Sequence, residues 1–331
     1  MKISILMPVY NAEKYLAACL ESIVNQSETN WELLAVNDFS TDNSEEILQN
    51  FARQDRRISV FQNTAKGIIP ALRLAFQHST GELITRMDAD DAMFSSKLAD
   101  LKAILIENGR GYLATGGVQY FSADELGAGY LKYEQWLNHL TTQSLNFTEI
   151  YKECVIPSPC WMVFREDLLL CESFDRTVYP EDYDLCFRFY KYGLKVVGSP
   201  QILHRWRDHA TRSSRTMEVY ANNHYFNLKL PYFLELDWQK DRPLVLWGAG
   251  KKGKQLAKML ENKGIPFYWF CNTPRKWGVR LFGTTLDNFE NITTLMKPQI
   301  IVAVGAPDAQ EEIKIYLSKV GVSSEDCYFF T

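Results

Sequence analysis

The sequence lacks any long apolar run. No stretch approaches the roughly 20 apolar residues that a membrane-spanning helix needs. Residues 1–10 carry one Lys and then alternate like a strand, without the apolar run and small-residue cleavage site of a secretory signal. The 331 residues are 46% hydrophobic and 23% charged, which excludes disordered, collagen-like and low-complexity proteins. We expect a globular protein of about two domains with no integral membrane segment.

An excess of positive charge is also missing. The chain has 36 Lys and Arg against 40 Asp and Glu, so no global basic field points to nucleic acid or an anionic membrane. From residue 241 onward, however, 12 basic residues face 9 acidic ones, so a phosphate-rich polymer would bind this tail first. The seven cysteines are scattered and contain no CxxC pair, which favours a reducing compartment. We expect a cytoplasmic protein, at most peripheral at the inner membrane face.

Strand and helix patterns alternate along most of the chain, which is typical of α/β folds with a mostly parallel sheet. The patterns predict strands at 3–9, 31–36, 58–62, 82–87, 112–121 and 160–164, and helices at 13–26, 44–54, 67–78 and 181–192. The region 101–151 is harder to interpret, and its details stay open.

A second α/β unit is predicted after Pro243, with strands at 244–247, 267–271 and 299–304 and helices at 254–263 and 309–320. The expected division is a domain of residues 1–216, a helical connector of residues 217–240 and a smaller Rossmann-like domain of residues 241–331.

Polar side chains follow three of the predicted strands. Ligands of open parallel sheets gather at the carboxyl ends of strands, so Tyr10, Asp38 and the Asp88–Asp91 run should converge. Asp88, Asp90 and Asp91 crowd three anions together with only Arg86 nearby. Carboxylates suit Mg²⁺ or Mn²⁺, which complete their coordination with substrate phosphates and water. The pattern therefore indicates a metal-bound diphosphate; the alternative is a solvated turn that caps a helix.

Three motifs occur together: MPVYN at 7–11, VNDFSTD at 36–42 and GELITRMDADD at 81–91. Each is weak alone, but in this order and spacing they resemble the family-2 inverting glycosyltransferases of the GT-A fold. The resemblance implies a GT-A domain that moves a hexose from a nucleotide diphosphate sugar, expected to be UDP-linked, to a hydroxyl group of a saccharide or glycoconjugate.

The resemblance also implies roles for single residues. Asp38 would accept a hydrogen bond from a uracil N–H, and His209 would be a third metal ligand beside Asp88 and Asp90. Arg212 and Arg215 would form a basic lid over the phosphates. The full set of expected donor-binding residues is Pro8, Val9, Tyr10, Asn11, Asp38, Lys66, Asp88, Ala89 and Asp90. Without the resemblance, Tyr10 could equally be a core aromatic and Asp38 an Asx-turn residue.

Glu181 and Asp182 directly precede a predicted helix and match an acidic pair of the family, of which Asp182 would be the catalytic base. A single displacement at the anomeric carbon needs a carboxylate opposite the leaving diphosphate to take the proton of the acceptor hydroxyl. The alternative is that both side chains only favour the dipole at the helix N-terminus.

The tail opens on a GxGxxG pattern at 248–253 that follows a strand and begins a helix, as in dinucleotide-binding folds. The acid expected at the end of the next strand is replaced by Cys271 and Asn272. We therefore favour a structural or partner-docking domain over an NAD site.

The two-part layout is similar to that of the β-1,3-N-acetylglucosaminyltransferase-like group, which includes the enzyme that galactosylates queuosine in tRNA. The acceptor thus stays open between a saccharide and tRNA, and a non-catalytic nucleotide-binding scaffold is the alternative from another class. The oligomeric state is open as well.

Overall fold

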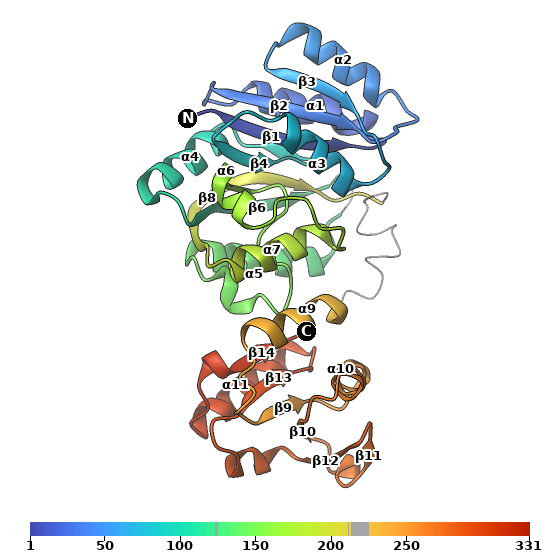
Figure 1. The fold of residues 1–331 in the computed structure, drawn as a ribbon, viewed down its shortest axis with the longest axis vertical. Coiled ribbons are helices and arrows are strands. Elements are labelled where there is room, and N and C mark those ends of the chain that lie inside the picture. The colour runs from blue at the N-terminus through green and yellow to red at the C-terminus, as the bar shows by residue number, and fades with distance from the viewer. Residues whose placement is uncertain (123–124, 211, 213–224) are drawn as a thin grey trace. The chain divides into compact units, whose positions relative to one another are not determined.

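The computed structural model describes residues 1–331 except 123–124, 211 and 213–224. The chain forms two compact units (Figure 1): the first contains residues 1–147 and 154–221, and the second contains residues 148–153 and 222–331. Helix α9 (Phe226–Leu236) lies within the predicted connector and belongs to the second unit. The expected boundaries at residues 216 and 240 stay a prediction.

The first unit is built on an eight-stranded sheet of order β3-β2-β1-β4-β7-β6-β8-β5. The four strands from β3 to β4 are parallel, β7 runs antiparallel to both of its neighbours, β8 is parallel to β6, and β5 is antiparallel to β8. The sheet is therefore mixed but mostly parallel. Its strands are β1 (Ile3–Val9), β2 (Trp31–Asn37), β3 (Ile58–Gln62), β4 (Leu83–Arg86), β5 (Ala92–Met93), β6 (Tyr112–Phe121), β7 (Trp161–Phe164) and β8 (Lys195–Arg207).

Helices connect these strands. In α1 the buried residues Leu16, Cys19, Leu20 and Ile23 recur at helical spacing and form one apolar face. The helices are α1 (Glu13–Val24), α2 (Ser44–Gln54), α3 (Ile68–His78), α4 (Lys97–Asn108), α5 (Ala128–Thr142), α6 (Arg165–Leu170) and α7 (Glu181–Lys191), and a 3-10 turn, η1, covers Asn146–Glu149. No helix in the described ranges is long and apolar enough to span a membrane.

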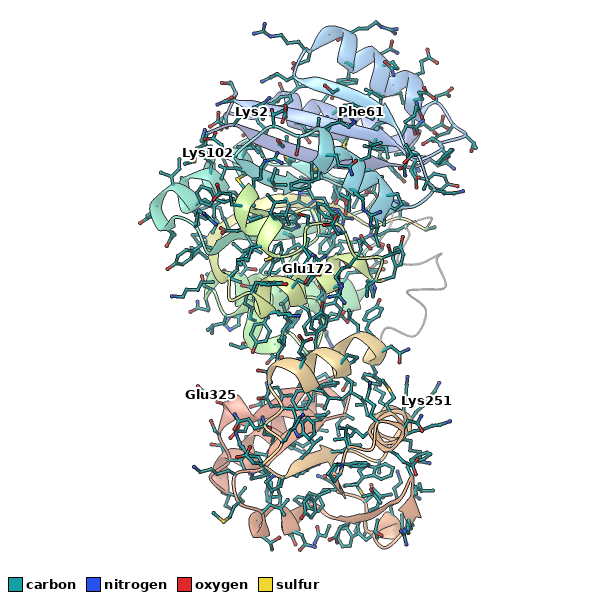
Figure 2. The ribbon with its side chains drawn as sticks, viewed as in Figure 1. Lys2, Phe61, Lys102, Glu172, Lys251 and Glu325 are labelled. Carbon is teal, nitrogen blue, oxygen red and sulfur yellow. The ribbon has the colours of Figure 1, made fainter. Side chains whose placement is uncertain are left out.

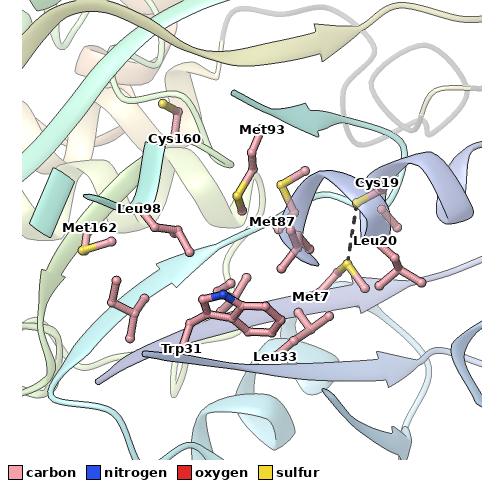
Figure 3. Close-up of a cluster of buried hydrophobic side chains, with 14 of the residues drawn as sticks. Met7, Cys19, Leu20, Trp31, Leu33, Met87, Met93, Leu98, Cys160 and Met162 are labelled. Atoms are coloured by element: carbon pink, nitrogen blue, oxygen red, sulfur yellow. Dashed lines mark hydrogen bonds between the residues drawn. The ribbon is translucent and has the colours of Figure 1, made fainter. Parts of the chain in front are cut away.

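A fully buried apolar cluster lies beneath the sheet ends that matter for the site. Figure 3 shows Met7 of β1, Cys19 of α1 and Met87 after β4 around this cluster, with the Cys19 Sγ 3.9 Å from the Met7 Sδ. Close-packed side chains leave the strand ends little room to move. The loops that follow β1 and β4 therefore start from rigid positions.

The second unit has its own sheet, of order β11-β12-β10-β9-β13-β14. All pairings in it are parallel except that of β11 with β12, and its Rossmann-like character stays a prediction. Its strands are β9 (Leu244–Trp247), β10 (Tyr268–Cys271), β11 (Arg280–Leu281), β12 (Thr284–Asn288), β13 (Gln299–Val302) and β14 (Cys327–Phe329). Its helices besides α9 are α10 (Lys251–Asn262), α11 (Pro307–Lys319), η3 (Pro274–Lys276), η4 (Phe289–Thr294) and η5 (Ser324–Asp326).

Candidate active site

The ends of β1 and β2 meet, as their parallel pairing requires. The backbone N–H of Asp38 donates to the carbonyl of Val9 at 2.7 Å. Beside this contact, Tyr10 and Phe39 are each 50% exposed, and the Lys66 ammonium lies 4.9 Å from the centre of the Tyr10 ring. The expected donor residues Tyr10, Asp38 and Lys66 thus come together. Phe39 was not expected; the signal in the sequence was an aromatic residue within the otherwise polar turn at 37–42.

The Asp38 carboxylate is buried and already has partners. It accepts hydrogen bonds from the backbone N–H of Gly67, 2.9 Å from each oxygen, and from the Asn63 amide at 2.7 Å. A carboxylate offers about four acceptor sites, so capacity for one further donor remains. Asp38 therefore fastens the end of β2 to the start of α3 whether or not it meets a ligand.

Other expected donor residues differ in what they present. Asn11 holds the neighbouring loop: its side-chain oxygen accepts from the Thr41 N–H at 2.8 Å. The side chains of Val9 and Ala89 belong to the buried cluster, and Pro8 lies within β1, partly buried. Of these last three, Val9 and Ala89 have only their backbone to offer a ligand.

The turn after β4 carries the two central carboxylates. One oxygen of Asp88 accepts from the Arg86 guanidinium at 2.9 Å and the other from the Ser158 hydroxyl at 3.1 Å. One oxygen of Asp90 lies 2.8 Å from the His209 Nε2. Burial alone would raise the pKa of Asp90, but the His209 hydrogen bond and the Arg212 charge bring it below its usual value. Asp90 is therefore ionised at neutral pH.

The acidic pair at the start of α7 faces this turn. The second guanidinium nitrogen of Arg86 lies 3.0 Å from the Glu181 carboxylate, so one buried arginine joins β4 to α7. Burial and the neighbouring charge of Glu181 raise the pKa of Asp182 to about 7, although Arg86 opposes this shift. A general base works best with a pKa near the operating pH. The structure thus gives Asp182 a property that its predicted role requires.

Two residues that link the parts of the site were not expected. Arg86 appeared in the sequence only as the nearest cation; its position inside an apolar strand was the signal that it must be paired. Tyr179 precedes the acidic pair, and a Cβ on Gly67 would lie 3.4 Å from its hydroxyl. Burial and the charges of Glu181 and Asp38 raise the pKa of Tyr179. Tyr179 therefore lies next to Gly67, which bonds Asp38, and within electrostatic reach of Glu181.

The end of β8 and the residues that follow it return to the turn. The Arg207 Nε donates to the Asp90 carbonyl at 2.6 Å, and its guanidinium stacks 4.5 Å from the Tyr15 ring centre. Arg212 lies with its guanidinium 4.9 Å from the Trp206 ring. Arg215 lies outside the described residues, so a lid of both arginines stays a prediction.

The site residues that the structure describes supply only part of the ligand set of a divalent cation. Across the described ranges, no group of three or more His, Cys, Asp or Glu side chains is arranged to hold a metal ion. Asp90 and His209 nevertheless present a carboxylate and an imidazole nitrogen at one point. Mg²⁺ commonly takes one or two carboxylates and completes its octahedron with phosphates and water. The pair is thus compatible with an ion that arrives with a diphosphate.

The glycine pattern of the tail lies at the start of α10, where Figure 2 labels Lys251. A Cβ on Gly253 would lie 2.0 Å from the Gly248 carbonyl oxygen, so glycine permits the close helix packing there. A cleft of about 490 Å³ opens beside it, and Asn272 on its wall accepts a hydrogen bond from Trp247 at 2.7 Å. A structural or partner-docking role for this domain stays a prediction.

Residues 4–169, half of the chain, match the family model "Glycosyl transferase family 2". The chain belongs to glycosyltransferase family 2. It is an enzyme of the type that transfers a sugar from a nucleotide-sugar donor. The first unit, with its mixed sheet flanked by helices, is accordingly GT-A-like, and this part of the fold expectation is confirmed. Membership of the β-1,3-N-acetylglucosaminyltransferase-like subgroup stays a prediction.

Relatives of this glycosyltransferase include the putative glycosyltransferase EpsE of Bacillus subtilis, 29% identical over 66% of this chain and 78% of the relative. The Escherichia coli protein named UDP-Glc:alpha-D-GlcNAc-diphosphoundecaprenol beta-1,3-glucosyltransferase WfgD is 28% identical over 55% of this chain and 67% of the relative. Two other relatives, from Rickettsia bellii and Streptococcus pneumoniae, are longer, and the chain spans 24% and 30% of them.

Among solved structures, TarS residues 1–349 of S. aureus in complex with UDP-GlcNAc superpose with a TM-score of 0.56 at 19% identity. The match covers 72% of this chain and 68% of that one. At this identity the likeness concerns the fold alone.

The raised pKa of Asp182 predicts a pH profile. If its carboxylate must be ionised, kcat/KM should rise with pH through an apparent pKa of about 7. Glu181→Gln removes a negative charge that disfavours ionisation, so the acid limb should move to lower pH. The rate of UDP release measured from pH 5 to 9 checks both curves. If the acid limb of the Glu181→Gln profile does not move, the charge of Glu181 does not influence the group that titrates.

Proposed function

We propose that this enzyme transfers a hexose, with inversion, from a UDP-linked sugar to a hydroxyl group of a saccharide or glycoconjugate. The observation that carries the proposal is the Arg86 bridge, in which one buried guanidinium pairs with Asp88 of the turn and with Glu181, the neighbour of Asp182. Inverting transfer needs two kinds of group: charged groups that bind the diphosphate, and a base beside the acceptor hydroxyl.

Asp182 takes the proton of the acceptor hydroxyl as that oxygen attacks the anomeric carbon, and the bond to the diphosphate breaks. Burial and the charge of Glu181 set its pKa near neutrality, so the side chain is both ionised often enough and basic enough to act. Arg86 limits the rise by its opposite charge. Glu181 is already paired with Arg86 at 3.0 Å, which leaves Asp182 as the base.

The donor nucleotide occupies the ends of β1 and β2. Tyr10 and Phe39 present exposed rings to a base, Asp38 keeps acceptor capacity, and the Lys66 cation stands beside Tyr10. Two relatives support a UDP-linked donor, since one carries UDP-Glc in its name and the other was solved with UDP-GlcNAc. The former also acts on a lipid-linked saccharide by its name, which favours a saccharide acceptor here.

Asp90 and His209 would hold Mg²⁺ or Mn²⁺, with Asp88 beside them. The ion would neutralise diphosphate charge when it is bound. Asp90 is suited to this position because it is ionised and partly exposed. His209 is oriented by the ring of Tyr15, whose centre lies 4.9 Å away.

A panel of nucleotide sugars tests the donor. We expect slow, metal-dependent release of UDP from at least one UDP-hexose, and no such release from GDP- or CMP-sugars. Excess EDTA should abolish it, and added Mg²⁺ or Mn²⁺ should restore it. Release from no member of the panel, with or without an added saccharide acceptor, would contradict the proposal.

Asp90→Ala tests the ligand assignment. Loss of this carboxylate should weaken metal-dependent UDP binding by about 10–100-fold, because the ion then loses one of its proposed protein ligands. Calorimetric titration of UDP with and without metal measures the change. Asp100→Ala, which changes a partly exposed acid on α4 that bonds Ser96, is the matched control and should bind like the wild type. Unchanged binding in Asp90→Ala would remove Asp90 from the metal site.

A further inference from the structure

Three polar side chains form a buried row beneath the Asp88–Asp90 turn. Lys97 begins α4, His204 lies in β8, and Asp91 follows the turn; none is more than 1% exposed. The Lys97 Nζ lies 3.1 Å from the His204 Nδ1, and the His204 Nε2 lies 2.9 Å from one Asp91 oxygen. Buried polar groups are costly unless each has a partner. Three polar groups buried together directly under the site therefore call for an explanation.

The chemistry of the three groups sets the direction of the row. With Lys97 as an ammonium, which only donates, and Asp91 as a carboxylate, which only accepts, the His204 Nδ1 accepts from Lys97 and its Nε2–H donates to Asp91. Lys97 also donates to the carbonyl of Pro159. The row therefore requires one tautomer of His204, with the proton on Nε2.

Both ends of the row reach the turn. The other oxygen of Asp91 accepts from the backbone N–H of Arg207 at 2.7 Å, and the Arg207 side chain donates to the Asp90 carbonyl at 2.6 Å. At the opposite end, Pro159 follows Ser158, whose hydroxyl donates to Asp88 at 3.1 Å. The buried row thus connects to Asp88 through the neighbouring residues Pro159 and Ser158, and to Asp90 through Arg207.

We propose that Asp91, His204 and Lys97 are positioning residues of the transfer reaction. They hold the end of β8 and the Ser158 loop against the turn, so that Asp88 and Asp90 keep one orientation toward the donor diphosphate. None of the three meets the donor; they act through Arg207, Ser158 and the turn itself. Groups fixed before the reaction need no reorganisation during it. The inference rests on the proposed donor site for its kinetic consequence.

Asp91→Asn tests the kinetic consequence. An amide in place of the carboxylate cannot accept from both His204 and Arg207, so the row is interrupted at the turn. Turnover of the UDP-sugar should fall by about 10–100-fold, as for other residues that orient a metal ligand. The matched control is Asp167→Asn, which changes a buried carboxylate that accepts from the Gly111 N–H at 2.8 Å, away from the turn.

The control separates positioning from simple stability. Both variants should lower Tm, but Asp167→Asn should keep kcat within about twofold of the wild type. If Asp91→Asn also keeps kcat within twofold, or if Asp167→Asn loses as much turnover, the positioning role is refuted. Should Asp91→Asn fail to fold, Lys97→Gln takes its place with the same expectation, because a neutral amide weakens the far end of the row.

A measurement without substrate tests the row itself. The chain has 5 histidines, so ¹⁵N-histidine labelling gives a small set of ring signals, and His204→Gln identifies the one that belongs to His204. We expect the Nε2–H tautomer at pH 7. A proton on Nδ1 would overturn the row. If the wild type turns over no nucleotide sugar, the proposed function fails and the kinetic consequence fails with it, while the tautomer still shows whether the hydrogen-bonded row exists.

Discussion

Asp182→Asn should reduce sugar transfer and donor hydrolysis by about 10²–10⁴-fold, the range over which a positioned general base contributes. Asparagine has almost the same shape as aspartate but cannot take a proton. UDP binding should stay close to that of the wild type, since the proposed role of Asp182 is to take a proton from the acceptor and not to bind the donor. Single-turnover release of UDP, measured beside calorimetric UDP binding, separates the two effects.

Asp184→Asn is the matched control for this variant. It makes the same change two residues along α7, at a buried carboxylate that pairs with Arg188 at 2.8 Å. It should cost stability yet keep turnover. If Asp182→Asn releases UDP as fast as the wild type, Asp182 is not the base. If neither the wild type nor Asp182→Asn turns over any donor while both bind UDP, the non-catalytic scaffold is the better description.

Arg86→Met should give the largest loss of stability. Arg86 is 5% exposed and pairs with Asp88 at 2.9 Å and Glu181 at 3.0 Å. Removal of one partner from a buried ion pair costs about 3–5 kcal/mol, because the remaining carboxylates are left uncompensated. At about 2–4 °C per kcal/mol for a unit of this size, Tm should fall by roughly 6–20 °C.

The same variant should also shift the pH profile. Arg86 lowers the pKa of Asp182, so its loss should raise that pKa and move the acid limb to higher pH, opposite to Glu181→Gln. Arg165→Met is the control: Arg165 donates to Ser79 and to the Gly81 carbonyl, before β4 begins, and should leave the profile unmoved. A limb that moves the same way in Arg86→Met and Glu181→Gln would contradict the electrostatic account.

The sequence predicted the strands whose apolar runs are uninterrupted, such as β7 and β9, and the helices with a clear apolar face. It did not predict β8, because Gly198 and Pro200 interrupt its pattern and His204, Arg205 and Arg207 replace apolar residues near its end. The side chains of β8 are polar where they approach the turn. The polar residues that hide this strand from a pattern-based prediction include those that contact the turn.

The site residues divide in a similar way. Local motifs marked Asp38, Asp88 and Asp90, each at the end of a strand. The pairing of Arg86 with Glu181 joins residues 95 positions apart, and that of Asp90 with His209 joins residues 119 positions apart. Local periodicity carries no information about such partners. The resemblance placed His209 near the metal, but the role of Arg86 as a bridge needed the fold.

Residues 148–153 bear on how the protein can be shortened. They belong to the second unit although the chain on both sides belongs to the first. Tyr151 stacks on Phe330 with ring centres 5.3 Å apart, and its hydroxyl hydrogen-bonds Asp237. A truncation after residue 221 would remove Phe233 and Phe330, the aromatic neighbours of Tyr151, and leave its ring without these packing partners. Loss of activity in such a fragment would then report misfolding of the first unit. Residues 222–331 therefore cannot be removed without affecting the rest of the chain.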